Sequence, residues 1–197
     1  MSESESPACA LAAVLTCQGT HERLLEIGEK LESFGWRATF FVDPARVGLP
    51  GAAAREDLKR LEELGHEIGL DARHDDAVDS AGRALGALLG GEPRAVLLAD
   101  PSRVPAVPPA MPACAAIADP SAPDAPGVRR PAGFATDSLD ALRAAWDRAQ
   151  AEGGVFHLHL DADAVAEDYE LWAQMECVIA WFCDHRGVRY IPFSALS

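Results

Sequence analysis

The chain has 197 residues, of which 49% are hydrophobic, and its 31 acidic side chains outnumber the 17 basic ones to give a formal net charge of -14. This length predicts one domain with a sizeable core. The negative charge, without any cluster of Lys or Arg, argues against binding to nucleic acid or to an anionic membrane surface.

The N-terminal segment 1–9 is small and acidic, and we expect a flexible tail there, ahead of a single domain over 10–197. The segment lacks the basic and apolar regions of a secretory signal. No apolar run approaches the roughly 20 residues that span a bilayer. We therefore expect a cytoplasmic protein. The five cysteines have no CxxC spacing, which favours reduced thiols over a disulfide framework or a zinc knuckle.

The first part of the chain alternates apolar strands with amphipathic helices. Strands are expected at 10–16, 37–43 and 66–72, and helices at 21–35 and 55–65. Strands that alternate with helices of about a dozen residues indicate parallel βα units.

The pattern continues less clearly in the rest of the chain. We expect a helix at 77–91, strands at 93–100 and 113–119, a helix at 136–153, a strand at 154–162, a helix at 166–187 and a last strand at 188–193. Two stretches, 102–113 and 120–133, hold most of the 14 prolines and are predicted as loops, because proline removes a backbone donor from any ladder it joins. Roughly seven βα repeats in a chain of this length predict an α/β fold with a small, incomplete barrel.

Three scaffold segments are distinctive: ATFFV at 38–42, GHEIG at 65–69 and the closing RGVRYIPFSAL at 186–196. In this order they resemble the polysaccharide deacetylase family, also called the NodB-homology domain or carbohydrate esterase family 4. The resemblance covers nearly the whole chain. It implies the distorted barrel of that family and an active site at the ends of the strands.

The positions that carry chemistry in the family are substituted in this chain. The family's first strand ends in T-F-D-D-G, and its two aspartates, a base and a metal ligand, correspond to Cys17 and Gln18. The family's two metal-binding histidines correspond to Asp71 and Asp75, and its late catalytic histidine corresponds to Asp161. The resemblance therefore implies a divergent member that lacks the metal-binding and catalytic residues of the family.

The exchange of imidazole for carboxylate removes the nitrogen ligands that suit zinc, so we expect no metal cofactor. The less favoured alternative is a divalent cation such as Mg²⁺, Mn²⁺ or Ca²⁺ that is bound by oxygen at Asp71, Asp75 and Asp161. Without a cation, three carboxylates that face one cavity would repel one another, which raises the pKa of at least one and suits acid/base chemistry. Solvated carboxylates at loop ends are the alternative reading.

Alternation along the late strand places His159 and Asp161 on one face and leucines on the other, so the histidine is expected to face the barrel interior. Cys17, at the end of the first strand, is a candidate nucleophile if His21, His74 or His159 lowers the pKa of its thiol. A small buried cysteine without a chemical role is the alternative.

These observations predict a repurposed, metal-independent enzyme for a small polar metabolite that resembles an N-acyl sugar, an amide or an imide. The candidate catalytic groups are Asp71, Asp75, Asp161 and Cys17, and the candidate substrate-binding groups are Gln18, His21, His74 and His159. Two other functions stay open: an inactive deacetylase-like protein that binds a ligand or a protein, and a deacetylase with an oxygen-rich metal site. The sequence leaves the oligomeric state open.

Overall fold

The computed structural model describes residues 11–74, 77–99, 113–115, 128–129, 132–133, 139–152, 154–185 and 188–196. The expected tail at 1–9 and the candidate Asp75 lie outside these residues.

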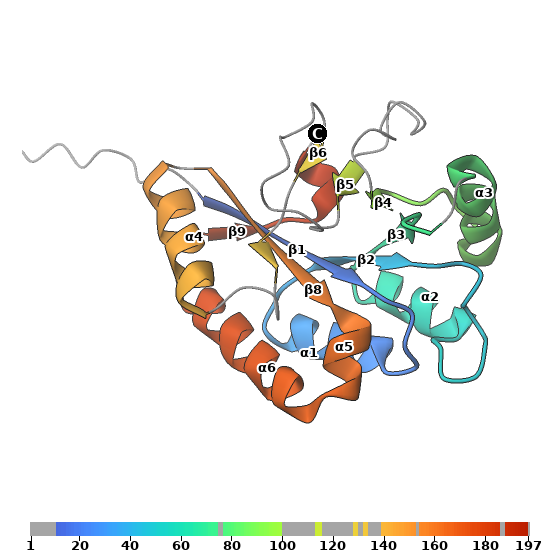
Figure 1. Ribbon diagram of the computed structural model, residues 1–197, viewed down its shortest axis with the longest axis horizontal. Coiled ribbons are helices and arrows are strands. Elements are labelled where there is room, and N and C mark those ends of the chain that lie inside the picture. Colours follow the sequence, from blue (N-terminus) through green and yellow to red (C-terminus); the bar gives the residue numbers. More distant parts are fainter. Residues whose placement is uncertain are drawn as a thin grey trace, which may run out of the picture.

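The described strands form one curled parallel sheet (Figure 1). Its strands are β1 (Leu11–Gln18), β2 (Ala38–Val42), β3 (Glu67–Asp71), β4 (Val96–Leu98), β5 (Ala113–Ala115), β6 (Val128–Arg129), β7 (Ala132–Gly133), β8 (Val155–Asp161) and β9 (Val188–Tyr190). The order is β6-β5-β4-β3-β2-β1-β8-β7, and β9 pairs with the start of β1. Because β6 and β7 are edges that do not pair with each other, the barrel is incomplete, as the sequence predicts.

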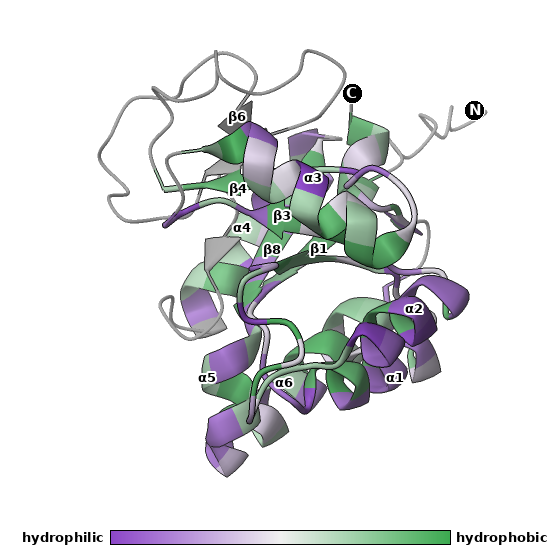
Figure 2. Cartoon of the chain, turned by 90° about the vertical axis from the view of Figure 1, so that its right-hand side faces the viewer, coloured by the Kyte–Doolittle hydropathy of each residue, from purple (hydrophilic) through white to green (hydrophobic). Residues whose placement is uncertain are grey.

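The helices are α1 (Leu24–Ser33), α2 (Arg55–Glu63), α3 (Val78–Leu89), α4 (Leu139–Glu152), α5 (Ala162–Glu167) and α6 (Tyr169–Cys183), followed by the 3-10 helix η2 (Phe193–Leu196). Helices α1, α2, α5 and α6 lie along one face of the sheet (Figure 2). No helix in the described part of the chain is long and apolar enough to cross a membrane.

The structure corrects two expectations about elements. The single helix expected at 166–187 is two helices, because Asp168 ends α5 and its carboxylate accepts hydrogen bonds from two backbone N–H groups in the first turn of α6, those of Glu170 and Leu171. The predicted loop at 120–133 also contains the two short strands β6 and β7.

Side-chain alternation along β1 separates two interiors. Ala13, Leu15 and Cys17 belong to the large apolar cluster between the sheet and the helices. Val14, on the opposite face of the strand, belongs to a smaller cluster inside the barrel, which contains Val14, Phe41, Ala95, Leu97 and Phe193. Since Phe193 comes from η2, the C-terminal segment packs into the barrel interior and leaves the polar positions further along β1 and β8 near the carboxyl ends of the strands.

Candidate functional site

The candidate site begins with the parallel pairing of β1 and β8. The register places Thr16 beside His159 and Gln18 beside Asp161. All four side chains lie on the barrel-interior face of their strands, beyond the small apolar cluster. The predicted orientation of His159 toward the interior is therefore confirmed.

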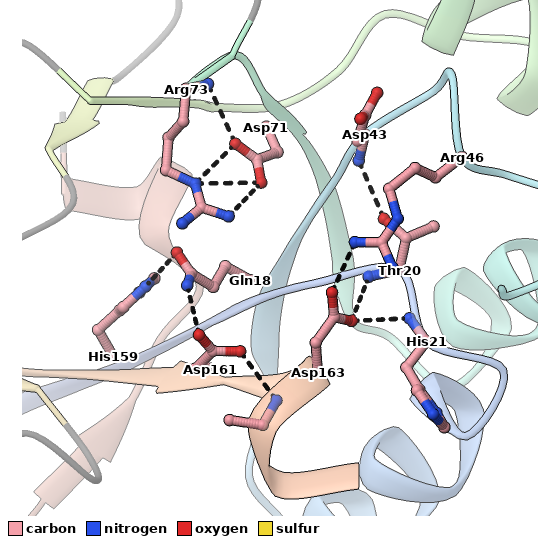
Figure 3. Close-up of polar contacts among 11 residues, drawn as sticks. Gln18, Thr20, His21, Asp43, Arg46, Asp71, Arg73, His159, Asp161 and Asp163 are labelled. Atoms are coloured by element: carbon pink, nitrogen blue, oxygen red, sulfur yellow. Dashed lines mark hydrogen bonds and ion pairs between the residues drawn. The ribbon is translucent and has the colours of Figure 1, made fainter. Parts of the chain in front are cut away.

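These side chains form a continuous chain of hydrogen bonds across the two strands. The Thr16 hydroxyl lies 2.9 Å from His157 Nε2 and 2.8 Å from His159 Nδ1. His159 Nε2 lies 3.1 Å from Gln18 Oε1, and Gln18 Nε2 donates to Asp161 Oδ2 at 2.9 Å (Figure 3). This series of hydrogen bonds, called the polar chain below, therefore links the buried His157 to the Asp161 carboxylate at the end of β8.

The positions of the protons in this series of hydrogen bonds follow from the Asp161 end. The Gln18 amide donates to Asp161, so its oxygen accepts the Nε2 proton of His159. A neutral His159 then accepts the Thr16 hydroxyl proton at Nδ1, and Thr16 accepts in turn from His157. Burial first, and then the nearby Arg73 charge, lower the pKa of His159 to about 4. The ring is therefore neutral near pH 7, as this network requires.

Asp161 accepts a hydrogen bond at each carboxylate oxygen. Gln18 donates to Oδ2, and the backbone N–H of Ala164 donates to Oδ1 at 3.0 Å, which caps α5. The residue is partly exposed. Among the described residues, no Arg or Lys forms an ion pair with it. The carboxylate is thus held in place by neutral donors and keeps acceptor capacity toward solvent.

Asp71, at the end of β3, is paired with Arg73. The Arg73 Nε lies 3.0 Å from Oδ1 and 3.2 Å from Oδ2, and its Nη2 lies 2.7 Å from Oδ2. Burial disfavours the Arg73 charge, but the bond to Asp71 and the charges of Asp71, Asp161 and Asp163 outweigh this and raise its pKa. The expected repulsion between unpaired carboxylates is therefore relieved at Asp71 by a cation.

The residues present do not fit the transition-metal site of the family. Both oxygens of Asp71 face a guanidinium, and the Gln18 amide oxygen faces a histidine N–H. Within the described ranges, no group of three His, Cys, Asp or Glu side chains could hold an ion. Asp75, the remaining candidate ligand, lies outside those ranges.

A second polar cluster, around Asp163, fixes the loops beside the site. Asp163 Oδ1 accepts from the backbone N–H groups of Thr20 (2.7 Å) and His21 (2.9 Å), and its Oδ2 lies 2.6 Å from Arg46 Nη1. Gly19 allows this approach, because its φ of 138° and a Cβ only 2.9 Å from Asp163 Cγ would both exclude a side chain. The cluster joins the loops after β1 and β2 to α5.

Four of the described candidate residues lie outside the polar chain: Asp71, which pairs with Arg73, and Cys17, His21 and His74. Cys17 is fully buried on the helix-facing side of β1, and burial raises the pKa of its thiol. The predicted convergence of Cys17 with the rim residues is therefore wrong, because β-strand alternation turns it away. The His21 ring accepts from the backbone of Arg23 and points away from Gln18 (Figure 3), and His74 is exposed in the turn after β3.

The sequence analysis missed four residues that shape this region. Thr16 shares the face of Gln18 two positions earlier on β1, which strand alternation alone indicates. Arg73 lies between the two aspartates of the DARHD segment, and this position indicates that its positive charge can neutralise a neighbouring carboxylate. Asp163 and Arg46 are 117 residues apart in sequence, so no local pattern predicts their ion pair.

No protein-family model matches the chain, and no curated protein matches it in sequence. Solved structures do share its fold. A Mycobacterium smegmatis protein described as a polysaccharide deacetylase aligns with a TM-score of 0.63 and 14% identity, covering 98% of this chain and 91% of that chain. PuuE allantoinase aligns with a TM-score of 0.64 and 13% identity (98% and 93% covered), and the T48 deacetylase with 0.61 and 18% (94% and 89% covered). The fold implied by the resemblance is therefore confirmed.

Proposed function

We propose that the chain is a metal-independent enzyme for a small polar metabolite of the N-acyl, amide or imide class, with Asp161 as its acid/base group. The observation that carries the proposal is the hydrogen-bonded chain from His157 to Asp161. It ends at the carboxyl ends of the strands, where barrel enzymes hold their catalytic groups. Solved structures of this fold include proteins named deacetylase and allantoinase, which favours an enzyme.

The reaction that suits this arrangement is hydrolysis of a carbon–nitrogen bond. Asp161 takes a proton from water, and the water oxygen forms a bond to the carbonyl carbon. The carbon–nitrogen bond then breaks, and the proton on Asp161 passes to the departing nitrogen. Gln18 donates a hydrogen bond to the Asp161 carboxylate, and the His159 N–H bound to the Gln18 oxygen fixes the orientation of the Gln18 amide. Together they hold the carboxylate in one orientation throughout the reaction.

Asp71 has a different role in this proposal from the one that the sequence suggested. Its carboxylate is engaged by Arg73 at both oxygens, so it anchors the arginine and does not serve as a free base. Asp75 stays a candidate acid/base group. The function thus relies on one carboxylate with neutral hydrogen-bond partners and does not need three that repel one another.

The test is hydrolysis of a small panel, N-acetylglucosamine, acetamide and hydantoin, by the full chain in the presence of EDTA, followed by NMR of the products. We expect turnover of at least one compound, and a loss of about 10²–10⁴-fold in Asp161→Asn, the usual contribution of a general acid/base. Asp147→Asn, an exposed change on α4, is the matched control and should keep full activity.

Two results would overturn the proposal. Activity that EDTA removes and Zn²⁺ or Co²⁺ restores would show a metal hydrolase. Absence of turnover across the panel, together with unchanged biological function when Asp71 and Asp161 are both replaced, would favour the non-catalytic binding protein.

A further inference from the structure

Arg73 combines a fixed orientation with a donor, Nη1, that no described residue uses. Its side chain is 22% exposed, and it lies on the Asp71 carboxylate, whose own side chain is 6% exposed. The backbone N–H of Arg73 also donates to Asp71 Oδ1 at 3.1 Å. Four hydrogen bonds from Arg73 to one carboxylate, one from its backbone and three from its side chain, leave the guanidinium plane little freedom, so its remaining N–H groups point in one direction.

The free part of this guanidinium faces the polar chain. Nε and Nη2 bind Asp71, whereas Nη1 has no hydrogen-bond partner within the described ranges. Figure 3 shows the guanidinium turned toward Gln18 and His159. The Arg73 charge lowers the pKa of His159, and the Asp161 charge raises the pKa of Arg73, so the cation lies within electrostatic reach of the polar chain.

We propose that Arg73 binds the carbonyl oxygen of a neutral amide or imide whose N–H group is bound by Asp161. This inference rests on the proposed function and specifies its substrate class. Guanidinium has only donors and a carboxylate only acceptors, so the two groups together match a ligand with adjacent C=O and N–H groups. In the reaction, Arg73 stabilises the negative charge that develops on the carbonyl oxygen.

The charges of the site favour a neutral ligand over an anionic one. Arg73 is already paired with Asp71, and Arg46 is paired with Asp163. Asp161 has no cationic partner among the described residues, so no ion pair within them compensates its negative charge. A ligand carboxylate would meet that charge, whereas a carbonyl oxygen accepts the Nη1 proton without repulsion.

The experiment measures binding of hydantoin, a neutral cyclic imide, to the full chain by isothermal titration calorimetry. We expect Arg73→Gln to weaken binding by roughly ten- to a hundredfold, the usual range for loss of a hydrogen bond to a charged group. The affinity of Arg73→Lys for hydantoin should lie between those of wild type and Arg73→Gln, because lysine keeps the positive charge but lacks the planar guanidinium. Arg143→Gln, at the apolar cleft between α4 and α6, is the matched control with unchanged affinity.

Sodium acetate is the anionic probe, and we expect it to bind much more weakly than hydantoin. Absence of hydantoin binding at millimolar concentration, equal binding to wild type and both Arg73 variants, or preference for acetate would each overturn the inference. Circular dichroism of each variant checks the fold. Failure of the inference is separate from failure of the proposed function: unchanged binding in Arg73→Gln with lost turnover in Asp161→Asn contradicts only the former.

Discussion

His159 is held between two side chains that fix which of its nitrogens carries the proton. Thr16 lies at Nδ1 and Gln18 at Nε2, and the ring is almost completely buried. A protonated ring would point a second N–H group at the Thr16 oxygen, and its positive charge would be buried away from water. Neutral His159 is therefore a condition for the Gln18 orientation that holds Asp161.

This environment predicts how stability depends on pH. The pKa of His159 is lowered from 6.5 to about 4 in the folded chain. Between these pH values the unfolded chain binds more protons. The free energy of unfolding therefore falls as the pH drops from 6.5 toward 4, by on the order of 3 kcal/mol for this residue. Urea unfolding at a series of pH values measures the fall.

We expect His159→Gln to be less sensitive than wild type across this pH interval. His21→Gln is the matched control, since the one hydrogen bond of the His21 ring within the described residues is to the backbone of Arg23. The same pH dependence in wild type and His159→Gln would contradict the assignment of a buried neutral ring.

Single residues show both the reach and the limit of sequence analysis. Gln18, His159 and Asp161 could be placed together, because strand alternation and the order of βα units determine their faces and their end of the barrel. Cys17 is one position away from Gln18, so the same alternation turns its side chain toward the helices, and its place at the strand end does not bring it to the rim. The pairing of Asp71 with Arg73 depends on the turn after β3, which residue pattern does not specify.

The loop after β1 depends on Asp163 of α5, although the two are far apart in sequence. Both backbone N–H groups after Gly19 donate to one carboxylate oxygen. Arg46, from the loop after β2, binds the other oxygen. Three elements thus meet at one side chain, and this contact keeps the end of β1, including Gln18, in a fixed position.

Gly19→Ala tests this contact. The φ of 138° is unfavourable for alanine, and the new Cβ would collide with the Asp163 carboxylate. We expect a loss of roughly 2–4 kcal/mol in the free energy of unfolding, from backbone strain and the lost carboxylate contacts together. Urea unfolding measures it. The control is Gly35→Ala, where φ is 72° but nothing lies within 4 Å of the new Cβ. Equal losses in both variants would mean that Asp163 adds nothing beyond backbone strain.

Strand and helix positions follow from the sequence more closely than helix ends do. Each predicted strand overlaps an observed one, because the sequence of a buried parallel strand is a short apolar run between turn residues. The break between α5 and α6 was missed. The apolar spacing on both sides of Asp168 is helical, and only the capping bonds of that carboxylate show where one helix ends and the next begins.

The molecule combines an intact deacetylase-like scaffold with a rim of different chemistry. The scaffold motifs lie in β2 and β3 and in the closing segment with β9 and η2. Phe40 and Ile68 pack in the cluster between the sheet and the helices, whereas Phe41 and Phe193 pack inside the barrel. The rim holds a carboxylate supported by an amide and a neutral histidine, together with an arginine fixed on a second carboxylate. The fold could therefore be predicted from scaffold motifs, whereas the charge pairing at the rim required the three-dimensional arrangement of β1, β3 and β8.

We propose that Arg73 and hydrogen-bonding side chains take the place of a metal ion at this rim. Metal content tests it most directly: the full chain is produced in zinc-supplemented medium, dialysed without chelator and measured by inductively coupled plasma mass spectrometry. We predict well below one ion per chain, and a thermal unfolding midpoint that neither Zn²⁺ nor EDTA changes, because the Asp71 oxygens are already engaged by a guanidinium. One zinc ion per chain that is lost in Asp71→Asn would contradict the account.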